Sequence, residues 1–253
     1  KLGDGVTEVA VGDRVAYTGA GKSYAEKVSV PSWRLVKVPD GMDIEVGAAA
    51  MLQGMTAHYL AYSTYPLKSG DTALIHAGAG GVGLLLIQMA KMAGAQVITT
   101  VSTKEKAAMA LGAGADHAVL YTEQDFAAEV MKITNNKGVQ VVYDAVGIDT
   151  FEGSVASLAP RGYLVLYGQA SGPVPPVSLS VLNPKSLFLT RPGLGSYTAT
   201  RAELEQRAGE VLGWVASGKL NIKIHGRYAL KDAADAHREL QGRLTSGKLL
   251  LIP

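Results

Sequence analysis

A glycine-rich turn between two apolar strands is the feature that most constrains the fold of this chain. Residues 72–103 read as a strand, the turn, a helix and a second strand, and the turn spells G-x-G-x-x-G over residues 78–83. The first glycine permits a tight turn, the second lets phosphates approach the backbone, and the third lets the helix pack closely on the strand. Free N–H groups at the start of the helix then face an anion. This order of elements predicts a dinucleotide-binding unit.

The residues after the second strand bear on the choice of dinucleotide. NAD-binding folds usually carry an acidic residue there, which accepts hydrogen bonds from the ribose hydroxyls. This chain has Ser102, Thr103, Lys104, Glu105 and Lys106 instead. Hydroxyls and cations at this place favour NADPH over NADH, whereas a Glu105 side chain that faces the ribose, or a set of simply solvated charges, would weaken that preference.

The composition is that of a soluble globular protein with a sizeable core. Hydrophobic residues make up 47% of the 253, and the net charge is +2 without a basic run. We therefore expect no nucleic acid as the main ligand. No apolar run reaches the roughly 18 residues that a membrane span needs. The amino terminus lacks the pattern of a signal peptide, so we expect no membrane partner and a cytoplasmic location.

Metal ligands and thiols are scarce in this sequence. Cysteine is absent, which excludes disulfides, a thiolate nucleophile and cysteine-ligated zinc. The five histidines show neither an H-x-x-H nor an H-E-x-x-H spacing. We therefore predict no metal site and expect the histidines to be structural.

Periodicity along the chain predicts an α/β protein with a small β unit in front. Short apolar runs predict strands at residues 15–17, 24–30 and 35–38, and residues 43–62 predict a helix that Gly54 interrupts. After the glycine turn, strands and helices alternate, with strands at 117–120, 139–144 and 163–167 and helices at 125–134 and 149–158. Such repeated βα units predict a parallel sheet with helices on both faces.

The ligand of an open parallel sheet lies beyond the carboxyl ends of its strands. Residues 144–147 and 167–169 follow two of the predicted strands and include Gly147 and Gly168, so we expect both segments to line the crevice. An ordinary turn is the alternative for each glycine.

The last quarter of the chain predicts an edge strand, two helices and a final strand. Residues 186–190 predict a strand at the sheet edge, where unpaired backbone groups favour a homodimer built by extending the sheet. Residues 201–217 predict an amphipathic helix and residues 230–240 a second one. We expect the strand at 248–252 to pair with an amino-terminal unit that precedes residue 1, because the chain reads as the remainder of a longer protein.

Six segments match a known family together: VGDRVAY, AAAMLQGMTAHYL, HAGAGGVG, VVYDAVG, LTRPGL and GRLTSGKLLLIP. On these segments the whole chain resembles the zinc-independent quinone oxidoreductases, the ζ-crystallin-like branch of the medium-chain dehydrogenase/reductase superfamily. The resemblance implies a Rossmann doubly wound parallel sheet plus a partial GroES-like β domain. It implies a partial GroES-like catalytic domain at 1–52, a Rossmann NADPH-binding domain at 53–190, and the end of the Rossmann domain with a return to the catalytic domain at 191–253.

The resemblance also implies which residues contact the cofactor. Implied contacts to NADPH come from Tyr59, Gly80, Gly81, Val82, Gly83, Ser102, Lys106, Tyr121, Val146, Gly168, Gln169, Leu189, Thr190, Arg191 and Arg243. Within this set, Lys106 and Tyr121 match the pair that holds the adenosine 2′-phosphate. Thr56 and Tyr59 match positions that border the reaction cleft on the substrate side. Ordinary packing is the alternative for Tyr59 and Tyr121.

The activity that the resemblance implies is hydride transfer from NADPH to a quinone or an α,β-unsaturated carbonyl, followed by proton uptake. Gln53 stands near the position where zinc-dependent relatives carry a cysteine ligand, so zinc chemistry is not expected. No general acid is identifiable, and we predict no catalytic residue. The alternative is a protein that holds NADPH without turnover, like crystallin-like or RNA-binding relatives, and the low net charge argues mildly against RNA.

Overall fold

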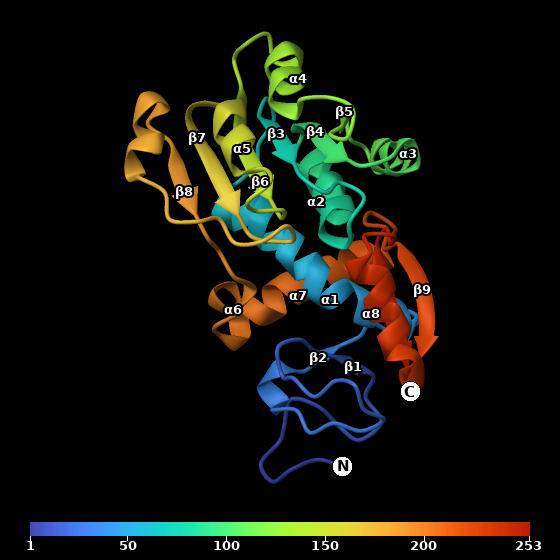
Figure 1. Ribbon diagram of the computed structural model, residues 1–253. Coiled ribbons are helices and arrows are strands. Elements are labelled where there is room, and N and C mark those ends of the chain that lie inside the picture. Colours follow the sequence, from blue (N-terminus) through green and yellow to red (C-terminus); the bar gives the residue numbers. More distant parts are fainter. The chain divides into compact units, whose positions relative to one another are not determined.

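The computed structural model describes all 253 residues, which divide into two compact units (Figure 1). One unit is Ala57–Gly193, and the other combines Lys1–Thr56 with Leu194–Pro253. None of the helices has both the length and the apolar character needed to cross a bilayer.

The Ala57–Gly193 unit is built on a six-stranded parallel sheet. Its strands are β3 (Thr72–Ile75), β4 (Gln96–Val101), β5 (His117–Leu120), β6 (Val139–Asp144), β7 (Leu158–Leu166) and β8 (Phe188–Thr190). They lie in the order β5-β4-β3-β6-β7-β8. Counted within this unit alone, that order is 3-2-1-4-5-6, the strand order of the dinucleotide-binding Rossmann fold. The direction of winding reverses between β3 and β6.

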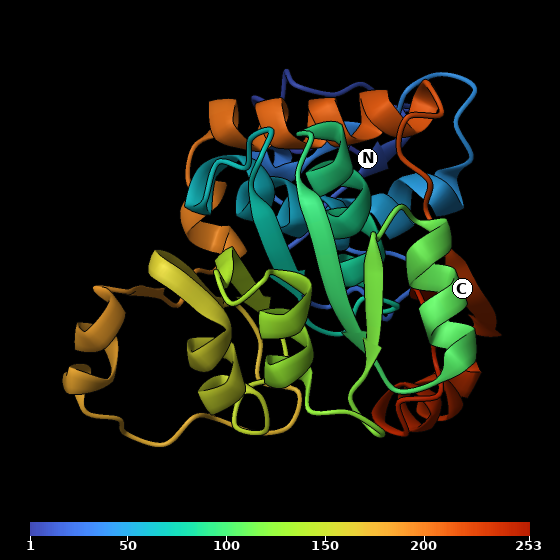
Figure 2. The ribbon, with the colours of Figure 1, turned by 90° about the horizontal axis from the view of Figure 1, so that it is seen from above.

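Helices cover both faces of this sheet (Figure 2). They are α2 (Gly81–Met92), α3 (Lys104–Gly112), α4 (Phe126–Ile133) and α5 (Phe151–Ser157), with the π-helix η2 (Leu60–Thr64) before β3 and the 3-10 helix η3 (Leu179–Lys185) before β8. Strand residues such as Leu74 of β3 and Val142 of β6 belong to one buried cluster with Val130 of α4 and Phe151 of α5. The predicted doubly wound sheet is therefore confirmed.

Two strands of this sheet differ from their predicted bounds. β7 begins earlier than predicted, at Leu158, because this residue already pairs with Val139 at the start of β6. β8 lies at the sheet edge, as predicted, but it is shorter. Ser186 has a φ of +50°, a left-handed conformation that ends η3 and is incompatible with a strand.

The other unit contains two small sheets and several helices. Its strands are β1 (Val15–Ala16) antiparallel to β2 (Val36–Lys37), and β9 (Ile224–Ala229) parallel to β10 (Lys248–Ile252). Its helices are α1 (Ile44–Tyr59, whose last residues belong to the first unit), α6 (Leu194–Tyr197), α7 (Arg201–Ala216) and α8 (Ala233–Gln241), with 3-10 helices η1 (Ser32–Arg34) and η4 (Leu230–Asp232).

One strand prediction for this unit is wrong. Residues 24–27 form bends and residues 28–30 have no regular structure, because no backbone ladder pairs with them. β10 pairs with β9, while its pairing with an amino-terminal unit that precedes residue 1 stays a prediction. β9 was not predicted because its sequence, IHGRYA, mixes polar and apolar residues without an apolar run.

Gly54 does not interrupt helix α1, which contradicts the prediction. A Cβ atom at this position would lie 2.6 Å from Cγ1 of Val211 in α7. Real carbon contacts are never this short, so the glycine serves close packing of α7 on α1 rather than a helix end.

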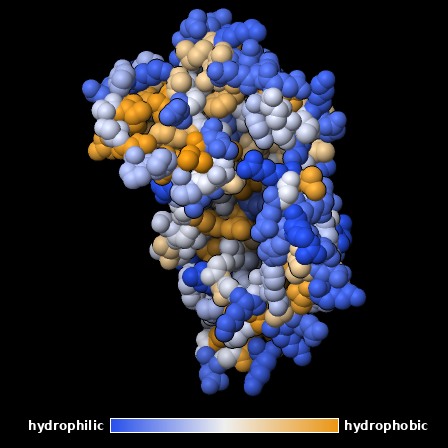
Figure 3. All heavy atoms as spheres, in the orientation of Figure 1, coloured by the Kyte–Doolittle hydropathy of each residue, from blue (hydrophilic) through white to orange (hydrophobic).

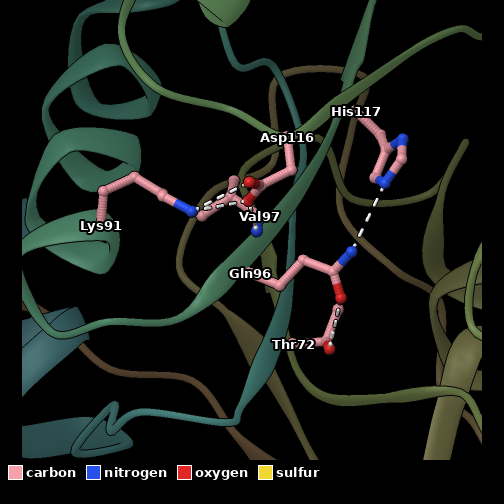
Figure 4. A network of polar contacts seen from close by, with 6 residues as sticks. All are labelled: Thr72, Lys91, Gln96, Val97, Asp116 and His117. Carbon is pink, nitrogen blue, oxygen red and sulfur yellow. Dashed lines mark hydrogen bonds and ion pairs between the residues drawn. The ribbon is translucent and has the colours of Figure 1, made fainter.

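Polar contacts tie together the amino ends of β3, β4 and β5 (Figure 4). Oδ2 of Asp116 accepts hydrogen bonds from Nζ of Lys91 at 2.8 Å and from the N–H of Val97 at 2.7 Å. Gln96 contacts Oγ1 of Thr72 at 3.2 Å and Nε2 of His117 at 3.4 Å. Burial alone would raise the pKa of Asp116, but the bonds from Lys91 and Val97 outweigh it and lower that pKa.

We expect Asp116→Asn to reduce stability at neutral pH and to have a diminishing effect in acid. A carboxylate with a lowered folded-state pKa stabilises the fold fully above its unfolded pKa, near 3.8, and this contribution is lost as the pH falls through the folded pKa. Urea unfolding of both proteins from pH 7 to pH 3 measures the difference, and exposed Asp40→Asn is the control. A wild-type advantage that stays constant across this range would contradict the role of the ion pair.

Candidate functional site

The glycine turn after β3 has no room for side chains at its first and last glycines. A Cβ atom on Gly83 would lie 2.3 Å from the carbonyl oxygen of Ala77 and 2.9 Å from Cα of Gly78. A Cβ atom on Gly78 would lie 1.9 Å from Oγ1 of Thr99, which is itself held by a 2.6 Å bond to the carbonyl of Ile75. These contacts force glycine at both positions and keep α2 close to the strand.

The start of helix α2 presents backbone N–H groups without a side-chain cap. Gly80 is the N-cap residue and makes no side-chain cap bond, and the first turn contains no acidic residue. Gly80, Gly81 and Val82 are half-buried, so solvent or a ligand reaches them. The positive end of the helix dipole and these amides together suit a phosphate group.

Ala77 opens the turn in a conformation that alanine rarely adopts. Its φ is +55°, in the left-handed region. Such strain costs on the order of 1 kcal/mol and persists where surrounding structure over-determines it, often beside a binding site. Here the hydrogen bond from the N–H of Gly80 to the carbonyl of Ala77, 2.9 Å long, closes the turn.

The predicted 2′-phosphate residues, Lys106 and Tyr121, and the predicted cofactor contact Ser102 lie at the adjacent carboxyl ends of β4 and β5. Ser102 follows β4, Lys106 lies in the first turn of α3, and Tyr121 follows β5. The N–H of Tyr121 donates to the carbonyl of Val101 at 3.2 Å, and Oγ1 of Thr122 donates to the carbonyl of Ser102 at 3.2 Å. These bonds bring Ser102 and Tyr121 together. Tyr121 is 45% exposed, so it is not an ordinary core residue.

The carboxylate of Glu105 makes hydrogen bonds at the start of helix α3. Its pKa is lowered chiefly by a hydrogen bond from its own backbone N–H and then by one from the hydroxyl of Thr103. Oγ1 of Thr103 in turn accepts the N–H of Lys106 at 3.2 Å as the N-cap of α3. The acid and Thr103 therefore cap the helix.

The loops after β6 and β7 are joined beyond the sheet. The N–H groups of Ala170 and Ser171 donate to the carbonyls of Ala145 and Val146 at 3.1 and 2.8 Å. A Cβ atom on Gly168 would lie 2.4 Å from the carbonyl oxygen of Ala145. Close packing of the two loops therefore requires glycine at position 168. The alternative that Gly168 only forms an ordinary turn does not account for this packing.

Arg191 at the end of β8 holds the second of these loops. Its Nη1 donates to the carbonyl of Leu166 at 2.9 Å, and its Nη2 donates to Oε1 of Gln169 at 3.1 Å. Because arginine has only donors, the oxygen of the Gln169 amide must face Arg191. The NH₂ group of Gln169 therefore points elsewhere and can donate to a carbonyl oxygen of a ligand.

A buried polar cluster beneath the crevice was not predicted. Asp144 and His76 are fully buried, and Oδ1 of Asp144 accepts the N–H groups of Val146 at 2.8 Å and Gly147 at 3.1 Å. His76 contacts Oγ1 of Thr100 at 2.8 Å and Oγ of Ser154 at 3.0 Å. Burial lowers the pKa of His76, against the opposing charge of Asp144, so the imidazole is neutral. The only sequence signal was a histidine and an aspartate, each at a strand's carboxyl end.

The remaining predicted residues are spread over the two units. Leu189 and Thr190 lie in β8, and Tyr59 is a buried residue at the end of α1. Thr56, one turn earlier on α1, donates to the carbonyl of Leu52 at 2.7 Å and belongs to the other unit. Arg243 also belongs to that unit, in a left-handed turn after α8 with a φ of +57°.

These side chains form no candidate metal site. No three His, Cys, Asp or Glu residues are grouped so that they could hold a metal ion. The chain has no cysteine, and Gln53 lies in a pocket of about 150 Å³ beside Tyr24, His237 and Lys248.

Comparisons with known proteins agree with this geometry. Residues 81–212 match the family described as zinc-binding dehydrogenase. A quinone oxidoreductase from Pseudomonas aeruginosa is 47% identical over all of this chain and 78% of its own length. A 2-haloacrylate reductase from a Burkholderia species is 41% identical, again over the whole chain and 78% of its length. The crystal structure of Escherichia coli quinone oxidoreductase complexed with NADPH superposes with a TM-score of 0.97 at 42% identity, covering all of this chain and 79% of that one.

Proposed function

The chain belongs to the quinone oxidoreductase family of the medium-chain dehydrogenase/reductase superfamily, and we propose that it carries out that family's chemistry on NADPH and a conjugated carbonyl acceptor. It is an NADPH-dependent, zinc-independent oxidoreductase that reduces quinones or α,β-unsaturated carbonyls. The main support for this proposal is the glycine turn, because its backbone amides and its glycines, which have no side chains, fit a diphosphate.

In this proposal, different residues of the Ala57–Gly193 unit contact different parts of the cofactor. Gly80, Gly81, Val82 and Gly83 hold the diphosphate, and Ser102, Lys106 and Tyr121 hold the adenosine 2′-phosphate. Lys106 supports this assignment as a cation in the first turn of α3, where Glu105 is engaged as a cap. Charge-assisted bonds to a phosphate are about twice as strong as neutral ones.

The second half of the cofactor lies along the loops after β6, β7 and β8 in this proposal. Val146, Gly168 and Gln169 border it, with Leu189, Thr190 and Arg191 beside the nicotinamide, which supplies the hydride when the cofactor is bound. The bond from Arg191 to Gln169 supports this assignment, since it leaves the Gln169 NH₂ group as a donor for a carboxamide or acceptor oxygen. Tyr59, Thr56 and Arg243 complete the proposed contacts, the first two on the substrate side.

We also propose the domain assignment that the family suggests. Residues 53–190 act as the Rossmann domain, residues 1–52 as part of a GroES-like catalytic domain, and residues 191–253 as the return to that domain. The position of the sheet within Ala57–Gly193 supports this assignment.

Consumption of NADPH with 9,10-phenanthrenequinone tests the reaction. We expect absorbance at 340 nm to fall when protein, NADPH and quinone are all present, and not when any one is omitted. Tight NADPH binding without turnover, in a protein extended to the full length of its relatives, would favour the non-catalytic alternative. A cytoplasmic location is a further proposal, which cell fractionation tests.

We propose that two copies pair through the β8 edge of the sheet. Figure 3 shows hydrophobic side chains gathered around this edge, where Phe188 is 50% exposed, Leu189 36% and Leu179 77%. The Phe188 ring stacks on Tyr163 with centroids 4.5 Å apart, so it is held in place for a partner. Exposed apolar patches of this kind commonly mark interfaces.

Phe188→Asp is expected to convert the dimer to a monomer, because it places a charge at the centre of the apolar edge. Sedimentation at micromolar concentration measures the mass, with Leu111→Asp on exposed α3 as the control that should remain dimeric. A monomer mass for the unmodified chain would remove the edge-strand proposal.

A further inference from the structure

Asp144 connects the ends of β6 and β7 beside the point where the sheet reverses. Its carboxylate accepts the N–H groups of Val146 and Gly147, as described, and its backbone carbonyl accepts the N–H groups of Tyr167 at 2.9 Å and Gly168 at 3.2 Å. One residue thus holds both loops that border the proposed nicotinamide half of the crevice.

Two hydroxyl groups complete the environment of this carboxylate. Oγ1 of Thr150 donates to Oδ1 and Oδ2 at 2.9 and 2.8 Å, and Oγ of Ser154 donates to Oδ2 at 2.9 Å. The carboxylate is fully buried, and its donors Val146, Gly147, Thr150 and Ser154 all come from the segment 146–154. Its position therefore follows the position of these donors.

The direction of the hydrogen bonds fixes the histidine tautomer. Ser154 has one proton, which it gives to Asp144, so it must accept from Nε2 of His76. A neutral imidazole carries only one proton, so Nδ1 is an acceptor and the hydroxyl of Thr100 donates to it. The chain of donors therefore runs from Thr100 through His76 and Ser154 to Asp144.

This chain joins the carboxyl ends of β3, β4 and β6. His76 directly follows β3, Thr100 lies in β4, and Asp144 ends β6. The carbonyl of Thr100 also accepts the N–H of Gly78, at 3.1 Å, so the glycine turn depends on the same residue. The His76 ring forms a T-shaped contact with the Phe126 ring, with centroids 4.8 Å apart, which restricts rotation of the imidazole.

We infer that Thr100, His76, Ser154 and Asp144 form a one-directional hydrogen-bond chain that positions the glycine turn and the Val146–Gly147 turn relative to each other for cofactor binding. These are positioning residues, since they act through backbone groups and not by touching a ligand. The inference rests on the proposed function for its ligand, but the tautomer at its centre is a property of the protein alone.

Imidazole ¹⁵N NMR of the whole chain reads the tautomer directly. We expect His76 to show a protonated, slowly exchanging Nε2 and an unprotonated Nδ1, and the signal is assigned by its loss in His76→Gln. A His76 protonated at Nδ1 would overturn the chain of donors.

Ser154→Ala tests the link between tautomer and binding. It breaks the chain between His76 and Asp144, so we expect mixed His76 tautomers and Kd values for NADPH and NADH that rise together, roughly fivefold. The two cofactors respond equally because the affected turns do not contact the 2′-phosphate in the proposed assignment. Ser157→Ala is a matched control, being equally buried on the same helix but bonded only to the carbonyl of Gly153 at 2.7 Å.

Thr100 provides a second pair of variants should Ser154→Ala fold poorly. Thr100→Val removes the donor to Nδ1 at nearly constant volume and should move the Nδ1 resonance and raise both Kd values, whereas Thr100→Ser should restore them. Unchanged Kd values in Ser154→Ala and Thr100→Val, with intact binding by the wild type, would overturn the positioning role. A wild type that binds no NADPH would instead refute the proposed function.

Discussion

Gly83→Ala is expected to weaken the binding of NADPH and NADH alike, by at least about tenfold each. The added Cβ would meet backbone atoms, the carbonyl oxygen of Ala77 at 2.3 Å and Cα of Gly78 at 2.9 Å, and no side-chain rotation relieves such contacts. Helix α2 must therefore shift away from the turn, which moves the amides of Gly81 and Val82 from the diphosphate. Overpacking of this kind also costs about 1–3 kcal/mol of stability.

Fluorescence titration with each cofactor measures the effect, at a temperature where thermal unfolding shows the variant to be folded. Gly112→Ala is the matched control, because Gly112 also lies in a helix and a Cβ there would meet nothing within 4 Å. Normal affinity in folded Gly83→Ala would mean that the start of α2 does not hold the diphosphate.

Lys106→Glu is expected to weaken NADPH binding by about 1–3 kcal/mol, the value of a charge-assisted phosphate contact. NADH lacks the 2′-phosphate, so its affinity should be nearly unchanged. The charge reversal also lies beside Glu105, whose carboxylate already caps α3, and the new acid would repel a phosphate at that place. The expected result is a change in cofactor preference and not a general loss.

A lysine-to-glutamate change at the amino ends of the strands is the control for the change in net charge. Lys137 is exposed and precedes β6, at the amino ends of the strands, so Lys137→Glu should leave both affinities unchanged. Equal losses for NADPH and NADH in Lys106→Glu would show that Lys106 does not recognise the phosphate.

The parallel sheet was predictable because its signals are local. β4, β5 and β6 have the predicted bounds, since each is a short segment rich in apolar and β-branched residues and bounded by turns. The glycine turn was equally clear, because the steric need for Gly78 and Gly83 arises within a few residues of each. β9 and residues 24–30 were not predictable, because pairing with a distant strand, and not composition, decides whether such segments become strands.

The polar part of the site depends on the same long-range factors. Ser154 meets His76 across 78 positions of sequence, and Arg191 meets Gln169 only because β8 lies beside β7. The spacing of these residues carries no periodic signal, so only the strand order brings them together. Gly54 illustrates the same limit, since its partner Val211 belongs to a helix far along the chain.

The ratio of the Kd values for NADPH and NADH in the unmodified protein tests the central claim most directly. Titration of both cofactors at the same ionic strength should give NADPH at least about tenfold tighter binding, as expected when a cation contacts the 2′-phosphate. Equal affinities, or tighter binding of NADH, would contradict the account of how this site selects its cofactor.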